Sequence, residues 1–115
     1  MRYHTSLVLL LVFIGSISIA AGRDEPKTAK EFIERGFLEY TSGAGKKAIQ
    51  DFTEALRIDP ASAIAFEWRG LAKIETKDFV GAVEDLTEAI RLEPKNPRLY
   101  FNRGLAKHQM GKPAR

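Results

Sequence analysis

A ten-residue stretch that occurs twice decides the fold of this chain. Residues 51–60 read DFTEALRIDP, and 34 residues further on positions 85–94 read DLTEAIRLEP. The pentapeptide RGLAK at 69–73 recurs unchanged at 103–107, after the same interval. Two complete copies and the beginning of a third, at one fixed period, indicate an architecture of stacked repeats.

The apolar residues within each copy follow helical spacing. Ile49, Phe52 and Leu56 are three and four residues apart, which places them on one face of a helix. Thr28, in a capping box, and Asn96, directly before a proline, stand where helix N-caps are expected. The sequence therefore predicts five helices and no strands, with the helices at 29–42, 46–58, 63–76, 79–92 and 97–110.

These residues resemble the tetratricopeptide repeat (TPR) family. Its pattern sets an aromatic residue at repeat position 4, Gly or Ala at 8, Ala at 20 and 27, a large apolar residue at 24 and Pro at 32. The matching residues are Phe32, Gly36, Ala48, Phe52, Ala55 and Pro60, then Phe66, Gly70, Ala82, Leu86, Ala89 and Pro94, then Tyr100 and Gly104. The resemblance implies an all-α, right-handed superhelical array of helix-turn-helix repeats, about two and a half in number. Its expected parts are a short linker at 23–28, repeats at 29–62 and 63–96, and a partial repeat at 97–115.

The resemblance also implies a binding surface, because in this family the first helix of each repeat lines a concave groove for a protein or peptide ligand. The corresponding residues here are Phe37, Tyr40, Glu67, Trp68, Leu71, Arg98, Phe101, Asn102 and Leu105. Ordinary packing between helices is an equal alternative for Leu71, whereas the polar tips of Trp68 and Tyr40 favour a half-wet groove.

One subfamily clamps a C-terminal carboxylate of chaperones with Lys and Asn side chains. This chain has Ile33, Phe37 and Trp68 at the clamp positions of the first two repeats, so the sequence predicts that the clamp is absent. Arg98 and Asn102 remain compatible with the part of the clamp that the third repeat supplies.

The beginning of the chain has the order of a secretory signal peptide, expected at 1–22. A basic start precedes an apolar run at 7–14, and small residues then allow cleavage after Ala20 or Gly22. The alternative is an uncleaved anchor, but the apolar stretch is shorter than the roughly 20 residues that a membrane span needs. The sequence thus predicts a secreted, periplasmic or cell-envelope location, with membrane anchoring as the alternative.

Composition excludes several classes of protein. The 115 residues contain no Cys, so a disulfide framework, a thiolate metal site and a Cys nucleophile are ruled out. Beyond the export segment, 17 basic and 15 acidic side chains are interspersed, which argues against a nucleic-acid footprint.

No side-chain pattern supports a reaction, a cofactor or a metal ion. His108 is the only imidazole beyond the export segment, and the Gly-rich residues 43–47 lack the spacing of a phosphate-binding loop, so they are predicted to form a turn. The carboxylates that recur at the repeat period are assigned to helix solvation and to ion pairs with nearby arginines; the carboxylates are Asp51, Glu54, Asp85 and Glu88, and the arginines Arg57 and Arg91.

The sequence therefore predicts a non-catalytic protein- or peptide-binding module exported to the cell envelope. The alternative is a structural assembly or oligomerisation unit, or the N-terminal fragment of a longer TPR protein. The last helix lacks a hairpin partner, which predicts that its apolar edge is covered by self-association, by a partner, or by residues missing from this chain. The large apolar residues of this helix are Leu99, Tyr100, Phe101, Leu105 and Met110.

Overall fold

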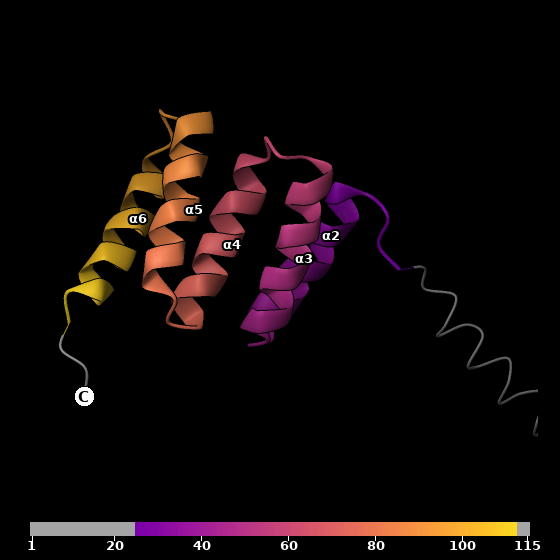
Figure 1. The fold of residues 1–115 in the computed structure, drawn as a ribbon, viewed down its shortest axis with the longest axis horizontal. Coiled ribbons are helices and arrows are strands. Elements are labelled where there is room, and N and C mark those ends of the chain that lie inside the picture. The colour runs from indigo at the N-terminus through magenta and orange to yellow at the C-terminus, as the bar shows by residue number, and fades with distance from the viewer. Residues whose placement is uncertain (1–24, 113–115) are drawn as a thin grey trace, which may run out of the picture.

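The computed structural model describes residues 25–112, which form five helices and no strand (Figure 1). The helices are α2 (Ala29–Thr41), α3 (Gly45–Ile58), α4 (Ala63–Glu75), α5 (Phe79–Leu92) and α6 (Pro97–Met110). Each end lies within one residue of the sequence prediction, so the all-α repeat array is confirmed. The expected signal segment at 1–22 falls outside the described residues. No helix within 25–112 is long and apolar enough to cross a membrane.

The helices begin where capping residues stand. The Thr28 hydroxyl accepts a hydrogen bond from the Glu31 N–H at 3.2 Å, and the Asn96 carbonyl oxygen accepts one from the Arg98 N–H at 3.1 Å. The capping box differs from the expected form in one detail. The Glu31 carboxylate accepts from the N–H of Lys27 at 3.1 Å, one residue before the cap.

The two complete hairpins close through the same turn. Gly43, between α2 and α3, has a φ of 83°, and Lys77, 34 residues later between α4 and α5, has a φ of 67°. Both residues occupy the left-handed region, which a glycine enters without steric penalty and a lysine enters at some cost. The segment at 43–47 is thus the end of a turn and the start of a helix, as predicted.

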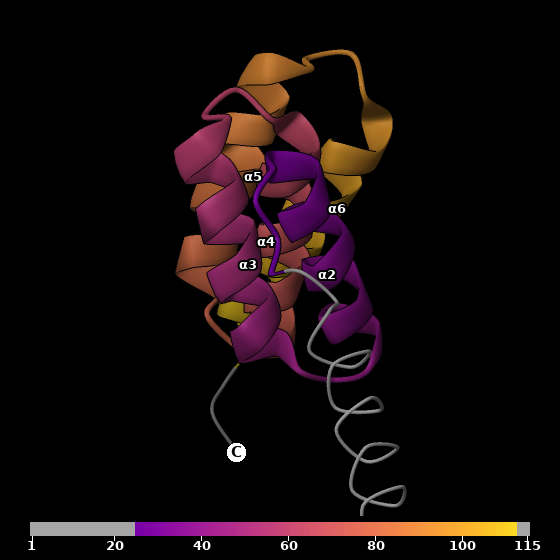
Figure 2. The same ribbon diagram turned by 90° about the vertical axis from the view of Figure 1, so that its right-hand side faces the viewer.

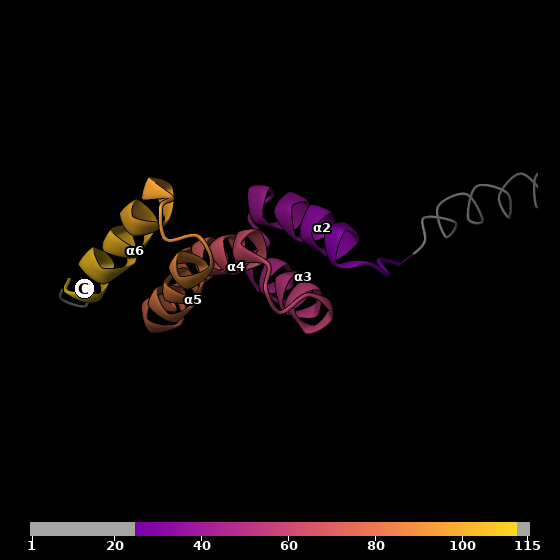
Figure 3. The ribbon, with the colours of Figure 1, turned by 90° about the horizontal axis from the view of Figure 1, so that it is seen from above.

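The first helices of the repeats lie on one side of the array and the second helices on the other. Figure 2, seen from the α2 end, and Figure 3, seen from above, both place α2 and α6 on the side away from α3 and α5. In Figure 3 the array bends so that α2 and α6 stand on the same side of α4. We call this side, formed by α2, α4 and α6, the inner face.

In the two complete repeats, a large apolar side chain of the second helix packs directly against a glycine of the first helix. A Cβ atom added to Gly36 would lie 2.8 Å from the ring of Phe52, which is fully buried, and one added to Gly70 would lie 3.0 Å from Leu86. Fully buried alanines lie on α3, α4, α5 and α6, and they allow neighbouring helices to approach equally closely. A Cβ atom added to Gly104, at the same position in α6, would meet nothing within 4 Å.

Candidate functional site

Three aromatic side chains join α2 to α4 on the inner face. The ring of Trp68 meets Phe37 at a centroid distance of 4.9 Å and an interplanar angle of 84°, and Tyr40 at 5.5 Å and 64°. These are edge-to-face contacts, which aromatic quadrupoles favour. Trp68 and Tyr40 are only partly buried and also pack against the core cluster around Phe52. Both side chains therefore serve helix packing and present a surface at the same time.

The hydroxyl of Tyr40 remains protonated at neutral pH. Burial, and secondarily the carboxylate of Glu75, raise the pKa of this phenol above its ordinary value of 10.0. Tyr40 therefore keeps a hydrogen-bond donor at neutral pH.

A buried carboxylate joins α4 to α6. Glu67 is only 2% exposed, and it accepts hydrogen bonds from Arg98 Nε at 2.6 Å and from Arg98 Nη2 at 2.9 Å. The side-chain amide of Asn102 donates a third bond at 3.3 Å. A carboxylate shielded from water in this way requires a counter-charge, and the guanidinium supplies it in bidentate form.

Glu67 is one of the side chains predicted to contact a ligand. In the structure its carboxylate is buried and is bound by Arg98 and Asn102. The side-chain donors of Arg98 and Asn102 both bind this internal carboxylate. A terminal carboxylate of a peptide would compete with Glu67 for Arg98.

The remaining predicted residues give the inner face its apolar character. Phe101 is 72% exposed and Leu105 is 38% exposed. Their spacing from Asn102 and from one another places them on the same side of α6 as the Glu67 network. Leu71 is partly buried on α4. The predicted site residues are thus brought together in two groups, an aromatic group at α2 and α4 and a network with exposed apolar neighbours at α4 and α6.

Sequence reasoning missed two ion pairs between the first and second helices, in each of which the aspartate is buried. Arg35 donates to Asp51 at 2.7 and 2.9 Å, and Arg69 donates to Asp85 at 2.9 and 2.7 Å. In the second repeat Lys73 adds a contact with Asp85 at 2.9 Å.

The assignment of these aspartates to helix solvation and to ion pairs with Arg57 and Arg91 is therefore wrong. Asp51 and Asp85 are 5% and 3% exposed. Arg57 and Arg91 pair as predicted with Glu54 and Glu88, each at 2.9 Å on the surface. The sequence did contain a signal for burial. Each aspartate has an alanine three residues before it and another four residues after it, which places it on the apolar side of its helix.

Glu39 occupies the position in the first repeat that Lys73 occupies in the second. One of its carboxylate oxygens is buried with no hydrogen-bond partner among the described residues, and Arg35 lies 3.9 Å from the other. Burial, followed by the proximity of Asp51, raises the pKa of Glu39 above its ordinary value of 4.5. The folded state therefore binds this proton more tightly than the unfolded chain does. The resulting stability is fully present below the ordinary pKa and is lost as the pH rises through the raised pKa.

We expect the substitution Glu39→Lys to raise the free energy of unfolding by about 1 kcal/mol at neutral pH, because it replaces a like charge near Asp51 by an opposite one. The gain should shrink as the pH falls below the raised pKa of Glu39, because the wild-type side chain then loses its charge. Urea unfolding at both pH values measures it. Glu34→Lys is the control, because Glu34 is exposed on the same helix. An equal gain for both variants would contradict a specific effect of Asp51.

Metal chemistry finds no support in the described part of the chain. Within residues 25–112, no group of three His, Cys, Asp or Glu side chains is placed to hold a metal ion. His108 is exposed near the end of α6.

Comparison with known proteins agrees with the repeat pattern. The family model for the TPR repeat matches residues 72–111. The second TPR of Spaghetti (RPAP3), bound to the HSP90 peptide SRMEEVD, is 26% identical with a TM-score of 0.71, over 74% of this chain and 79% of that chain. The Arabidopsis OM64 TPR domain is 29% identical with a TM-score of 0.70, over 72% of this chain and 69% of that chain.

The TPR2AB domain of yeast Sti1, in its complex with pHSP90, shares the fold at 23% identity with a TM-score of 0.70. The match covers 90% of this chain and 41% of the Sti1 chain. No curated protein matches the chain. The family model over residues 72–111 and the solved structures support a likeness to the TPR repeat family, and the class of fold that they show is an all-α array of helical repeats.

Proposed function

We propose that this chain is a non-catalytic module that binds a peptide segment of another protein on its inner face. The observation that carries the proposal is the exposure of Phe37, Phe101 and Leu105 on that face, on either side of the partly buried Trp68. Large apolar side chains in contact with water are common at binding sites for proteins. One structural neighbour, the second TPR of Spaghetti, is bound to an HSP90 peptide, which supports peptide binding as the kind of function of this array.

The ligand is a segment that binds through apolar side chains. Glu67 neutralises Arg98, so the inner face offers no unpaired guanidinium to a terminal carboxylate at that point. Tyr40 supplies a hydrogen-bond donor beside the aromatic group. An extended or helical peptide with one or two large apolar residues fits this combination of partly wet aromatic rings and few free charges.

Site-specific photocrosslinking in intact cells tests the proposal. A photoreactive phenylalanine analogue at Phe101 should capture a second protein, whereas the same analogue at Val80 should not. Val80 is the matched control because it is 57% exposed but belongs to α5, on the other side of the array. Equal capture at both positions, or none at Phe101, would contradict the inner face as the binding surface.

With the captured segment as a labelled peptide, Phe101→Ala is expected to weaken binding about 30-fold, which corresponds to the roughly 2 kcal/mol of an aromatic hot spot. The melting temperature should stay unchanged, because Phe101 is mostly exposed. Val80→Ala should leave the affinity as it is.

We also propose that the chain is exported, since residues 1–22 have the order of a signal peptide. The mature protein is then expected to begin at Ala21 or Arg23. The intact mass of the protein recovered from its own cells decides this. A mass that includes Met1, with the protein in the membrane fraction, would replace cleavage by anchoring.

A further inference from the structure

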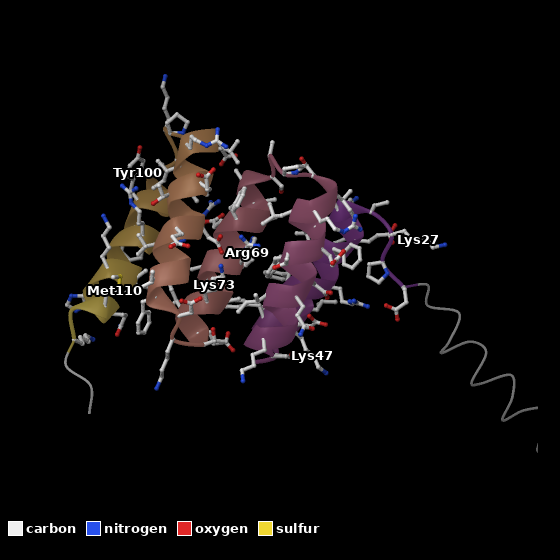
Figure 4. All side chains as sticks on the ribbon, viewed as in Figure 1. Lys27, Lys47, Arg69, Lys73, Tyr100 and Met110 are labelled. Atoms are coloured by element: carbon white, nitrogen blue, oxygen red, sulfur yellow. The ribbon has the colours of Figure 1, made fainter. Side chains whose placement is uncertain are left out.

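Within residues 25–112, three carboxylates are buried and each is held by an arginine; these carboxylates are Asp51, Glu67 and Asp85. The arginines differ in their access to water. Arg69, which holds Asp85, is 18% exposed and lies with Lys73 in the middle of the array (Figure 4). Arg98, which holds Glu67, is 63% exposed on the inner face. A ligand on the inner face can therefore reach the charge of Arg98, whereas the charge of Arg69 is enclosed in its hairpin.

Helix α6 offers three hydrogen-bond donors that converge on one carboxylate. The Nε and Nη2 atoms of Arg98 lie 2.6 and 2.9 Å from the two carboxylate oxygens of Glu67. The Nδ2 atom of Asn102, one helical turn later, lies 3.3 Å from one of the same oxygens. A guanidinium fork and an amide in this arrangement suit any carboxylate, whether it belongs to an acidic side chain or to a chain end. In this chain α4 itself supplies the carboxylate.

Competition for these donors favours Glu67 over a ligand. Glu67 is 2% exposed, so a ligand that took Arg98 would leave a buried carboxylate without its counter-charge, which is strongly unfavourable. The new pair between Arg98 and the ligand would lie in water and contribute little. The ligand would also lose translational freedom, whereas Glu67 is already fixed on α4. All three differences disfavour the displacement of Glu67 by a ligand carboxylate.

We propose that Glu67 is a specificity-determining residue of the inner face. Its carboxylate occupies the donors of Arg98 and Asn102 and thereby excludes ligand segments that place a carboxylate at this point. The ligand residue opposite Arg98 consequently carries no carboxylate, and a single substitution at Glu67 opens the face to acidic segments. This inference rests on the proposed function, because it names the class of segment that the same face accepts.

A short acidic peptide is the probe. SRMEEVD, the HSP90 peptide to which the second TPR of Spaghetti is bound, ends in an aspartate and therefore has two carboxylates on its last residue. Three fluorescent forms are compared: the free acid, its C-terminal amide, and the free acid of SRMEEVN. Fluorescence anisotropy with the full wild-type chain should show either no binding or affinities within about twofold of one another, because Glu67 keeps Arg98 occupied.

Removal of the Glu67 charge should create a carboxylate site. Glu67→Gln keeps the shape of the side chain, and this variant should bind the free acid of SRMEEVD about tenfold more tightly than the wild type does, through one charge-assisted pair with Arg98. The peptide form that loses this gain identifies the carboxylate, the amide form for the chain end and SRMEEVN for the aspartate side chain. Addition of Arg98→Gln should abolish the gain.

Glu75→Gln is the matched control, because Glu75 is an exposed glutamate on the same helix. It removes the same charge from α4 and should change the affinity for the free acid less than about twofold. Glu67→Met is a second variant at the site itself, since an apolar side chain of similar length can replace a buried charge without loss of folding. It should give the same gain as Glu67→Gln. Circular dichroism should show each variant folded.

Three results would overturn the proposal. The first is tighter binding of the free acid than of the amide by the wild-type chain, abolished by Arg98→Gln. The second is the absence of any gain in folded Glu67→Gln and Glu67→Met, and the third is an equal gain in Glu75→Gln. The proposed function fails separately, on the absence of capture at Phe101, because none of these peptides enters that measurement.

Discussion

Replacing Phe52 by alanine is expected to lower the free energy of unfolding by about 3–5 kcal/mol, the usual cost of deleting a buried aromatic side chain. Phe52 is fully buried, and its ring fills the space that Gly36 leaves open. A domain of this size has a total stability of roughly 5 kcal/mol or a little more. Urea unfolding followed by circular dichroism should therefore show a partly unfolded chain even without denaturant.

Two further variants make this result specific. Phe52→Leu should cost only about 1 kcal/mol, because Leu86 fills the equivalent space in the second repeat. Phe101→Ala removes the same atoms from a side chain that is 72% exposed and should cost less than about 0.5 kcal/mol. Similar losses for Phe52→Ala and Phe101→Ala would show that the small-to-large contact contributes little to the hairpin.

Replacing Asp85 by alanine is expected to cost about 2–4 kcal/mol. The substitution leaves Arg69 and Lys73 next to each other with no carboxylate between them, and both side chains are only 18% exposed. Removal of one partner of a buried pair costs up to about 5 kcal/mol; some of this is recovered here because both cations keep partial contact with water. Urea unfolding at low and high salt measures the loss.

Glu88→Ala is the matched control for Asp85→Ala. Glu88 lies on the same helix and forms a hydrogen-bonded ion pair with Arg91 at 2.9 Å, but both side chains are largely in water. Exposed pairs contribute little, so the expected loss is below about 0.5 kcal/mol. A double-mutant cycle of Asp85→Ala with Arg69→Ala should give a coupling above 1 kcal/mol, on the order of that seen for residues in direct contact. Equal losses for Asp85→Ala and Glu88→Ala would contradict the importance of burial.

The candidate site could be predicted only in part, and Glu67 shows why. Its position in the repeat predicts that it lies on the inner face, next to Trp68. Its burial depended on Arg98, which is 31 residues away and belongs to another helix. A pattern within one repeat contains no information about a contact of that kind, so the network became visible only when α4 and α6 were placed side by side.

The aspartates of the second helices illustrate the same limit. Asp51 lies on the apolar side of α3, but composition alone favours a solvated carboxylate. The deciding fact is that the turn at Gly43 brings Arg35 within hydrogen-bond distance of it. Glu39, which lacks a partner for one oxygen, could be distinguished from an ordinary surface glutamate only after that hairpin had closed.

The helices and their order followed from the sequence alone, because the period of 34, the helical spacing of Phe52 and its neighbours, and the capping residues act over short distances along the chain. The environment of each charged side chain did not follow from the sequence. Whether a carboxylate is solvated, paired or left without a partner depends on side chains that approach from other helices, and on the water that they exclude. For that reason only the packed array distinguishes Asp85, which is held by two cations, from Glu88 three residues later, which forms its ion pair on the surface.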